Sequence, residues 1–369
     1  MKKKYSDNLK IFFILFFVIL TNIDLYAKNS SRTQKIFIGL LYNANEASLT
    51  TSNGVENHIK KGLELAISEL GTEKNKLAFD WINVGETAES TLQIKNKLIE
   101  KNYDYIIGPS HSFQVALLDK IVKEAKLKTV IVSPAATSDE LLNSNHVFLM
   151  SNSNSVQAKL LINMIKPIPH QKLLIVKIKD CMYCDNFSGF IALELKKRNL
   201  PFKELTIYES DIKNSALYKD TESYDHIFIP ALEAQIAEII SVIWNKNKSA
   251  HYWSGDGVGS LGRFVRQLDF CKDLHLSWLS HYHVDLETNT NQTFRKKYNN
   301  KYLINPIDTS AFYYESLKLT IHKFVFKKNY DSFLTGKSTI RKNQIIRDMP
   351  ILSLQNGQVI LKGIATHGN

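Results

Sequence analysis

Short apolar runs alternate along most of this chain with longer segments whose apolar residues recur at helical spacing. The clearest example lies between Tyr105 and Leu142, where apolar runs at Tyr105–Ile107 and Val130–Val132 flank one such segment. Its spaced residues are Val115, Leu118, Ile121, Val122 and Ala125. This pattern predicts a strand, a helix and a second strand, the unit from which parallel sheets are built.

The same alternation continues on both sides of this unit. It predicts further strands at 36–41, 77–84, 147–150, 173–178, 205–209, 227–229, 251–254 and 276–279. It predicts helices at 54–70, 88–101, 156–165, 185–198, 233–244, 260–268, 293–302 and 310–326. Residues 331–347 are polar and basic, and a closing hairpin at 351–361 has Asn356-Gly357 as its turn. Together these elements predict an α/β fold with two doubly wound parallel sheets in two halves of similar size.

Small hydroxyl residues follow the two strands of the central unit. Ser110 and Ser112 come after the first strand, and Ser133 and Thr137 come at the end of the second. Ligands of open parallel sheets bind at the carboxyl ends of the strands, where helix N-termini also offer free NH groups. The sequence therefore predicts a ligand site here, although Ser112 and Ser138 could instead serve only as helix N-caps.

The N-terminus has the three parts of a secretory signal peptide. A basic segment, MKKKYSDNLK, precedes the apolar run Ile11–Leu20, and Ala27 is a plausible cleavage position. The apolar run is shorter than the ~20 residues of a membrane span. We expect residues 1–27 to be removed and a soluble protein to be exported to the periplasm; an uncleaved anchor is the alternative.

The chain is basic, with a formal net charge of +11 that falls to +9 once the four Lys and two Asp of the signal are removed. A basic balance raises the question of nucleic acid. However, the Lys and Arg residues are scattered in pairs and triplets such as Lys60-Lys61 and Lys196-Lys197-Arg198, without interleaved aromatic residues. We therefore expect solvated helix faces and no nucleic-acid partner.

Several motifs extend this interpretation to a known family. They are IIGPSHS at 106–112, SPAATSDEL at 133–141, DCMYCDNFSGFIALELKKRN at 180–199, YWSGDG at 252–257 and PILSLQNGQVIL at 350–361. In motifs and element order the chain resembles the type I periplasmic binding proteins, specifically the leucine/isoleucine/valine-binding branch of ABC-importer receptors. The resemblance implies two lobes joined by a three-crossover hinge, with the ligand in the cleft between them. It places 28–151 plus 284–349 in one lobe and 152–283 plus 350–369 in the other.

The resemblance also implies roles for individual residues. The ligand carboxylate would be held by Ser112, flanked by Ser110 and His111, and the ligand amino group by the loop Ala135, Ala136 and Thr137. From the other lobe, Tyr183 would close over the ligand and Asp256 would neutralise its amino group. Such pairing is needed because unpaired charge is costly to take out of water.

This sequence departs from the family pattern at three places. Leu232 stands where a second aromatic residue is expected, Asp256 replaces a longer Glu, and cysteines flank Tyr183. Tyr42, at the end of the first strand, either faces the side-chain pocket or serves as an ordinary core or surface residue. These departures bear on the identity of the ligand more than on the fold.

Two further motifs suggest other chemistry. Cys181 and Cys184 lie between a strand and a helix, where a thioredoxin-like redox pair would lie, but in an exported protein a structural disulfide is favoured. Free thiols, or pairing with Cys271, remain open. His281, His283 and Asp285 alternate along the chain and could bind a metal, although a hinge or surface position is more typical.

The function predicted from these residues is a periplasmic receptor that captures a small polar ligand, an amino acid above all, and delivers it to an inner-membrane ABC permease. We expect no enzymatic activity, no cofactor and no metal. The alternatives are a periplasmic sensor or envelope interaction protein with the same fold, and a thiol-redox protein that uses Cys181 and Cys184.

Overall fold

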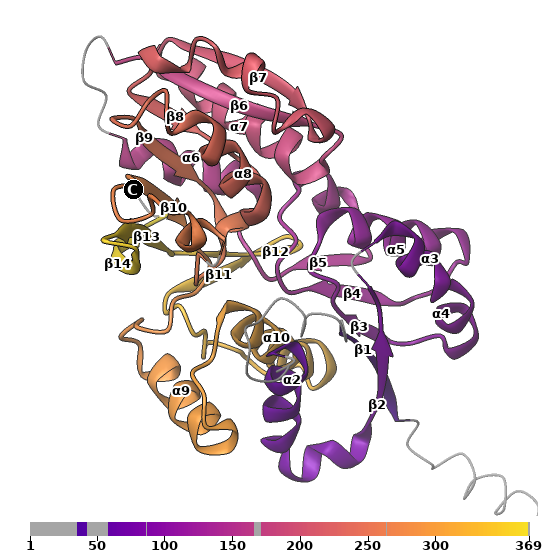
Figure 1. The fold of residues 1–369 in the computed structure, drawn as a ribbon. Coiled ribbons are helices and arrows are strands. Elements are labelled where there is room, and N and C mark those ends of the chain that lie inside the picture. Colours follow the sequence, from indigo (N-terminus) through magenta and orange to yellow (C-terminus); the bar gives the residue numbers. More distant parts are fainter. Residues whose placement is uncertain (1–34, 43–57, 86, 166–170, 263, 368–369) are drawn as a thin grey trace, which may run out of the picture.

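The structure is a computed structural model, and it describes residues 35–42, 58–85, 87–165, 171–262 and 264–367. The predicted signal peptide and the loop 43–53 lie outside these residues. The described chain forms two lobes, each built around its own sheet with helices on both faces (Figure 1). Within the described residues no helix has the length and apolarity needed to cross a membrane.

The sheet of the first lobe contains seven strands among the described residues, in the order β11-β12-β5-β4-β3-β1-β2. Their bounds are β1 (Ile36–Tyr42), β2 (Leu77–Asn83), β3 (Tyr105–Ile107), β4 (Val130–Ser133), β5 (Val147–Leu149), β11 (Ser338–Arg341) and β12 (Gln344–Arg347). Strands β1 to β5 pair in parallel, and only β11 runs antiparallel to its neighbour. The carboxyl ends of β1, β3 and β4 therefore meet at one edge of the sheet.

The second lobe repeats this architecture in the order β14-β13-β10-β9-β8-β6-β7. Its strands are β6 (Leu173–Lys179), β7 (Phe202–Tyr208), β8 (His226–Phe228), β9 (His251–Ser254), β10 (Leu276–Leu279), β13 (Met349–Gln355) and β14 (Gln358–Ala365). The strands β6 to β10 pair in parallel, and the hairpin β13–β14 adds an antiparallel edge. The prediction of an α/β fold with two doubly wound lobes is confirmed.

The chain passes between the two sheets three times: between β5 and β6, between β10 and β11, and between β12 and β13. Asn152, in the first crossing, is hydrogen-bonded to residues at the other two crossings. The Asn152 amide group donates to the carbonyl of Arg347 (2.7 Å) and accepts from its N–H (2.9 Å). The Asn152 N–H donates to His281 Nε2 (3.0 Å). The lobe boundaries given above stay a prediction, but these contacts define where the lobes are joined.

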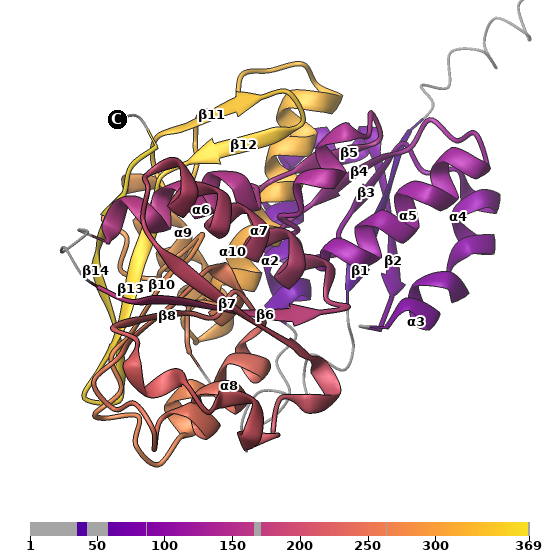
Figure 2. The ribbon, with the colours of Figure 1, turned by 90° about the horizontal axis from the view of Figure 1, so that it is seen from above.

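Helices cover both sheets. They are α2 (His58–Ser68), α3 (Ala88–Gln93), α4 (Lys95–Lys101), α5 (Ser112–Glu124), α6 (Asn154–Met164), α7 (Met182–Lys197), α8 (Glu233–Ile243), α9 (Asn289–Tyr302) and α10 (Asp308–Leu319), which continues into a π-helix at Thr320–Val325. Seen from above, α5 and α7 face each other where the lobes meet (Figure 2). Met182 of α7 packs there against the first-lobe core. The two lobes are therefore in contact beside the hinge.

The structure differs from the predicted elements in three places. The helix predicted at 260–268 is wrong: only short 3-10 turns form, because Gly259 and Gly262 adopt positive φ angles of 72° and 53°. The helix predicted at 88–101 is broken into α3 and α4 at Ile94. The polar region 331–347 contains the hairpin β11–β12, which has too little apolar patterning to be recognised as strands.

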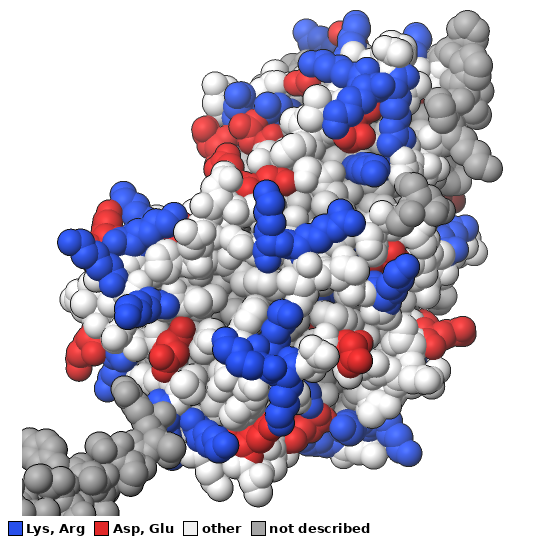
Figure 3. Space-filling model, turned by 180° about the vertical axis from the view of Figure 1, so that it is seen from behind, with Lys and Arg blue, Asp and Glu red and all other residues white. Residues whose placement is uncertain are grey.

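Charged side chains are mixed on the surface. On the face drawn in Figure 3, Lys and Arg side chains are interspersed with Asp and Glu rather than gathered in one stripe. This distribution is typical of solvated helix faces.

Candidate functional site

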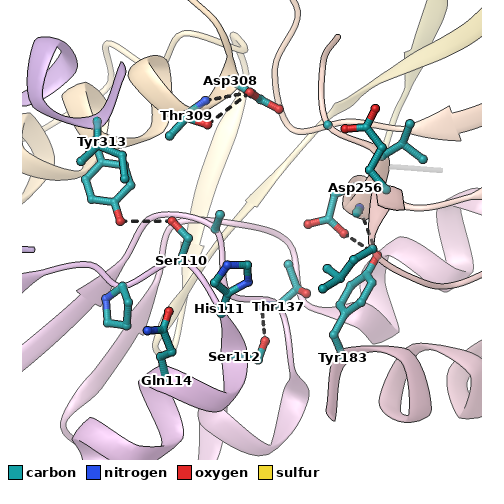
Figure 4. A pocket seen from close by; sticks show the side chains of 18 of the residues that line it. Ser110, His111, Ser112, Gln114, Thr137, Tyr183, Asp256, Asp308, Thr309 and Tyr313 are labelled. Atoms are coloured by element: carbon teal, nitrogen blue, oxygen red, sulfur yellow. Dashed lines mark hydrogen bonds between the residues drawn. The ribbon is translucent and has the colours of Figure 1, made fainter. Parts of the chain in front are cut away.

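A cavity of about 460 Å³ lies between the two lobes (Figure 4). From the first lobe it is lined by Leu41, Tyr42, Ile59, Val84, Gly85, Pro109, Ser110, His111, Ser112, Gln114, Ala135, Thr137, Asp308, Thr309 and Tyr313. From the second lobe it is lined by Tyr183, Leu232, Glu233, Ala234, Asp256, Gly257, Val258, Gly259 and Phe264. The size is within the usual ~300–1,000 Å³ of small-molecule sites.

Eight of the nine residues predicted to bind ligand line this one cavity. They are Tyr42, Ser110, His111, Ser112, Ala135, Thr137, Tyr183 and Asp256. The exception is Ala136, whose side chain is buried in the first-lobe core and whose N–H donates to Ser133 Oγ (3.2 Å). Ala136 therefore supports the loop without facing the cavity, whereas its neighbours Ala135 and Thr137 line it.

The first-lobe wall is built from the loops that follow β3 and β4. Ser133 Oγ donates to the Pro109 carbonyl (2.7 Å) and so joins the two loops. Ser112 Oγ makes a second link, because it accepts from the N–H groups of Thr137 and Ser138 (both 3.3 Å). Within the described part of the chain, the Ser112 O–H group donates to no acceptor. These bonds tie the two loops together into one wall that carries the Ser112 hydroxyl.

Ser112 and Ser138 do not act as side-chain N-caps, the alternative raised by the sequence. The N-cap of α5 is His111, without a side-chain capping bond. Ser138 precedes the 3-10 helix Asp139–Asn143 and makes no capping bond either. Ser112 instead lies at the start of α5, a helix end that attracts negative charge.

The second-lobe wall centres on Asp256, in the turn after β9. The Tyr183 hydroxyl donates to Asp256 Oδ1 (3.0 Å), and the Gly257 N–H donates to that hydroxyl (3.2 Å). Burial and the Asp256 carboxylate raise the pKa of Tyr183 well above its usual value, so the phenol stays protonated as a donor. A Cβ on Gly257 would lie 2.2 Å from the Ala231 carbonyl oxygen, so this tight turn requires glycine.

Tyr183 lies in the sequence between two cysteines that form a disulfide. The structure joins Cys181 and Cys184, which are the N-cap and third residue of α7, with an S–S distance of 2.02 Å. Cys271 is free and half-buried. The disulfide therefore closes the first turn of the helix that carries Tyr183, and it leaves Cys271 out of the pairing.

Several lining residues have no signal in the motifs. Asp308, Thr309 and Tyr313 come from the start of α10, far away in sequence, and Tyr313 accepts from the Ser110 hydroxyl (3.1 Å) (Figure 4). Phe264 comes from the segment predicted to be a helix, and it adds an aromatic side chain to the same cavity that Leu232 lines. Only the tertiary structure places these residues at the cavity.

Asp308 also connects the lobes. Its carboxylate accepts from the Ser260 N–H of the second lobe (2.7 Å), and its own N–H donates to Ser260 Oγ (3.3 Å). Asp308 itself lines the cavity, on the opposite lobe from Asp256.

The residues His281, His283 and Asp285 do not converge on one point. His281 turns toward Asp256, whereas His283 Nδ1 accepts from the Asp285 N–H (3.3 Å). Within the part of the chain that the structure describes, no group of three or more His, Cys, Asp and Glu residues is arranged to hold a metal ion.

Comparison with solved structures identifies the architecture. LivJ from Streptococcus pneumoniae, a branched-chain amino acid transporter substrate-binding protein solved in complex with isoleucine, matches with a TM-score of 0.70 at 17% identity over 90% of this chain and 99% of that one. The leucine-binding protein LivK from Thermotoga maritima matches with a TM-score of 0.73 at 17% identity, over 90% and 99% of the two chains. The chain has the type I periplasmic binding protein fold.

The same fold is found with a different ligand class. A solute-binding protein of an ABC transporter from R. palustris, solved with benzoate, matches with a TM-score of 0.66 at 18% identity over 90% and 96% of the two chains. No model of a protein family matches the sequence. No curated protein matches it either.

Proposed function

We propose that this protein is an exported receptor that binds a free amino acid between its lobes and passes it to an ABC permease in the inner membrane. The observation that carries the proposal is the opposition, across one cavity, of a donor wall on the first lobe and a carboxylate on the second. A zwitterion needs both kinds of partner, because each of its charges must be compensated when it leaves water.

The ligand carboxylate fits the first-lobe wall. The Ser112 hydroxyl still has its proton to donate, and it lies at the N-terminus of α5, where the helix dipole favours an anion. The ligand amino group would lie toward Asp256, with the Ala135 carbonyl and the Thr137 hydroxyl as further acceptors. Charged hydrogen bonds of this kind contribute about 1.5–3 kcal/mol each.

The ligand side chain fits an apolar part of the lining. Leu41, Ile59 and Val84 from the first lobe and Leu232 and Phe264 from the second supply apolar side chains to the same cavity. Solved structures with this fold hold isoleucine in one case and benzoate in another, which supports a small ligand with an apolar body. Export through a cleaved signal peptide, and delivery to a permease, complete the proposal.

A thermal-shift screen against the twenty L-amino acids tests this function. At a ligand concentration of 100 Kd, the bound protein gains about 2.7 kcal/mol in its free energy of unfolding, which raises the melting temperature measurably. A response to benzoate but to no amino acid would contradict the amino-acid assignment. A flat response across both would favour a sensor or envelope interaction protein with the same fold.

Two substitutions test the assignment of charges. D256A and T137A should each abolish amino-acid binding in calorimetric titration while the far-UV circular dichroism spectrum stays that of the wild type. Retained affinity in both variants would reject the zwitterion model.

A further inference from the structure

His281 is a buried histidine in the segment that connects β10 to α9, one of the three crossings between the lobes. Its side chain is 1% exposed. Its Nε2 accepts a hydrogen bond from the backbone N–H of Asn152 (3.0 Å), which lies in another crossing. A ring nitrogen that accepts cannot carry a proton, so the proton of this imidazole is assigned to Nδ1.

The Nδ1–H group faces Asp256, which lines the candidate ligand site. Among the described residues it is a buried polar atom without a hydrogen-bond partner. The carboxylate oxygen Oδ2 of Asp256 lies 3.4 Å away, while the other oxygen of that carboxylate is taken by Tyr183. Asp256 therefore lies between a phenol from α7, which donates to it, and an imidazole from the hinge, whose Nδ1 faces it at 3.4 Å.

The same ring touches the first lobe. Phe312 of α10 packs edge-on against it, with the ring centroids 5.9 Å apart and the planes at 82°. Through Asn152, the ring is also connected to Arg347, the last residue of β12, where the third crossing begins. One side chain thus contacts the hinge, a helix of the first lobe and the key carboxylate of the second lobe.

We propose that His281 is a positioning residue for Asp256: its Nδ1–H group aligns the carboxylate for a ligand cation, and its Nε2 fixes that alignment to the hinge. The 3.4 Å between Nδ1 and Oδ2 is just beyond the ~2.7–3.2 Å of an N–H···O hydrogen bond, so a small shift of the carboxylate brings the two atoms within hydrogen-bonding distance. The consequence for ligand affinity rests on the proposed function. The tautomer of His281 and its contact with Asp256 are independent of that function.

The first experiment needs no ligand. In protein labelled with ¹⁵N-histidine, long-range ¹H–¹⁵N correlation spectra report which ring nitrogen carries the proton. We expect the Nδ1–H tautomer at His281, and a change of its signals in the variant D256N. An Nε2–H tautomer, or signals that are the same in D256N, would overturn the proposal even if amino acids bind.

The second experiment uses two variants that each keep half of the imidazole. In H281N the side-chain amide can still donate from the Nδ1 position, whereas in H281Q the amide oxygen can still accept from Asn152. With the amino acid that gives the largest thermal shift, we expect H281Q to weaken binding about tenfold, from the loss of a hydrogen bond to a charged group, and H281N to stay within about threefold.

A double-mutant cycle separates positioning from a general structural role. In the D256N background, H281Q should have no further effect on affinity, because the carboxylate that it positions is gone. Equal losses in H281N and H281Q, additive with D256N, would overturn the proposal. If no amino acid binds the wild type, the proposed function fails, and the spectra still decide the role of His281.

Discussion

At the scale of single residues, the candidate site depends on how one carboxylate is held. Asp256 accepts from Tyr183 and faces His281, and its own N–H donates to Gln157 Oε1 (3.3 Å). These contacts orient its oxygens before any ligand arrives. Preorganised groups of this kind bind more tightly because less order has to be created on binding.

The Tyr183 hydroxyl gives the most direct test of this preorganisation. In Y183F the donor to Asp256 is lost, and the Gly257 N–H loses its acceptor. We expect amino-acid affinity to fall about ten- to a hundredfold, since a hydrogen bond to a charged group is worth about 1.5–3 kcal/mol. Calorimetric titration measures this loss. The control is Y208F, at a tyrosine that is 55% exposed; an equal loss in both variants would contradict the role of Tyr183.

A second residue-scale prediction concerns pH. Burial, together with neighbouring His226 and His275, lowers the pKa of His251 to about 4, and burial also lowers the pKa of His226. The unfolded chain therefore binds more protons than the folded protein below the ordinary histidine pKa of about 6.5. The contribution of these two histidines to the free energy of unfolding should be fully present above about pH 6.5. It should be lost as the pH falls from about 6.5 toward 4.

Urea unfolding at pH 7.5 and at pH 4.5 measures this dependence. The contribution of His251 to the difference should be on the order of 1–3 kcal/mol, and it should disappear in H251Q. If H251Q has the same dependence on pH as the wild type, another group is responsible.

At the scale of elements, the first lobe depends on the close packing of α2 against α10. A Cβ on Gly62 of α2 would lie only 2.2 Å from the Ser310 carbonyl oxygen of α10. Glu69, directly after the end of α2, accepts from Tyr314 and Lys318 of α10 (2.8 and 2.9 Å). Since α10 begins with Asp308 and Thr309, this packing also positions part of the cavity.

The variant G62A should therefore destabilise the protein, although alanine is normally preferred in helices. We expect a loss of about 1–3 kcal/mol in the free energy of unfolding, the usual cost of overpacking. The matched control is G189A in α7, where a Cβ meets no atom within 4 Å. That variant should be neutral or stabilising by up to about 1 kcal/mol. Equal effects in urea unfolding would contradict the packing argument.

At the scale of the whole molecule, the two lobes are held on both sides of the cavity. Near the hinge, Asn186 of α7 accepts from the Asp139 N–H and from the Asn154 amide (3.3 and 2.9 Å). On the other side, Asp308 and Ser260 form their reciprocal pair. The contacts at Asp308 and Ser260 must break if the lobes are to move apart about the crossings, so they stabilise the arrangement of the lobes in this structure.

The variant S260A tests this contact without changing a residue that lines the cavity. It removes the acceptor for the Asp308 N–H and leaves the second bond in place. We expect the amino acid to dissociate about three- to tenfold faster, as follows from a net hydrogen-bond contribution of about 0.5–1.5 kcal/mol. Stopped-flow fluorescence measures the rate. The control is D331A, at an exposed residue of the first lobe. An unchanged dissociation rate in S260A would contradict the role of the Asp308–Ser260 contacts in holding the lobes together.

The sequence by itself determined the features that are local. The alternation of apolar runs with helical spacing predicted two doubly wound lobes, and Asn356-Gly357 predicted a hairpin turn in which both residues have positive φ angles of 50° and 73°. The hydroxyl residues after β3 and β4 were also visible, because a motif and the strand it follows are adjacent along the chain.

Tertiary structure alone decided what comes from distant parts of the chain. Tyr313 meets Ser110 across 203 residues, and His281 reaches Asp256 only because the hinge and the second lobe pack together. The helix predicted at 260–268 was replaced by turns once Gly259 and Gly262 had to pass beside Asp308 and Trp278. The physical reason is that the pattern of apolar and polar residues along the sequence indicates backbone preference and burial. The partners of a buried polar group are instead set by how distant elements pack together.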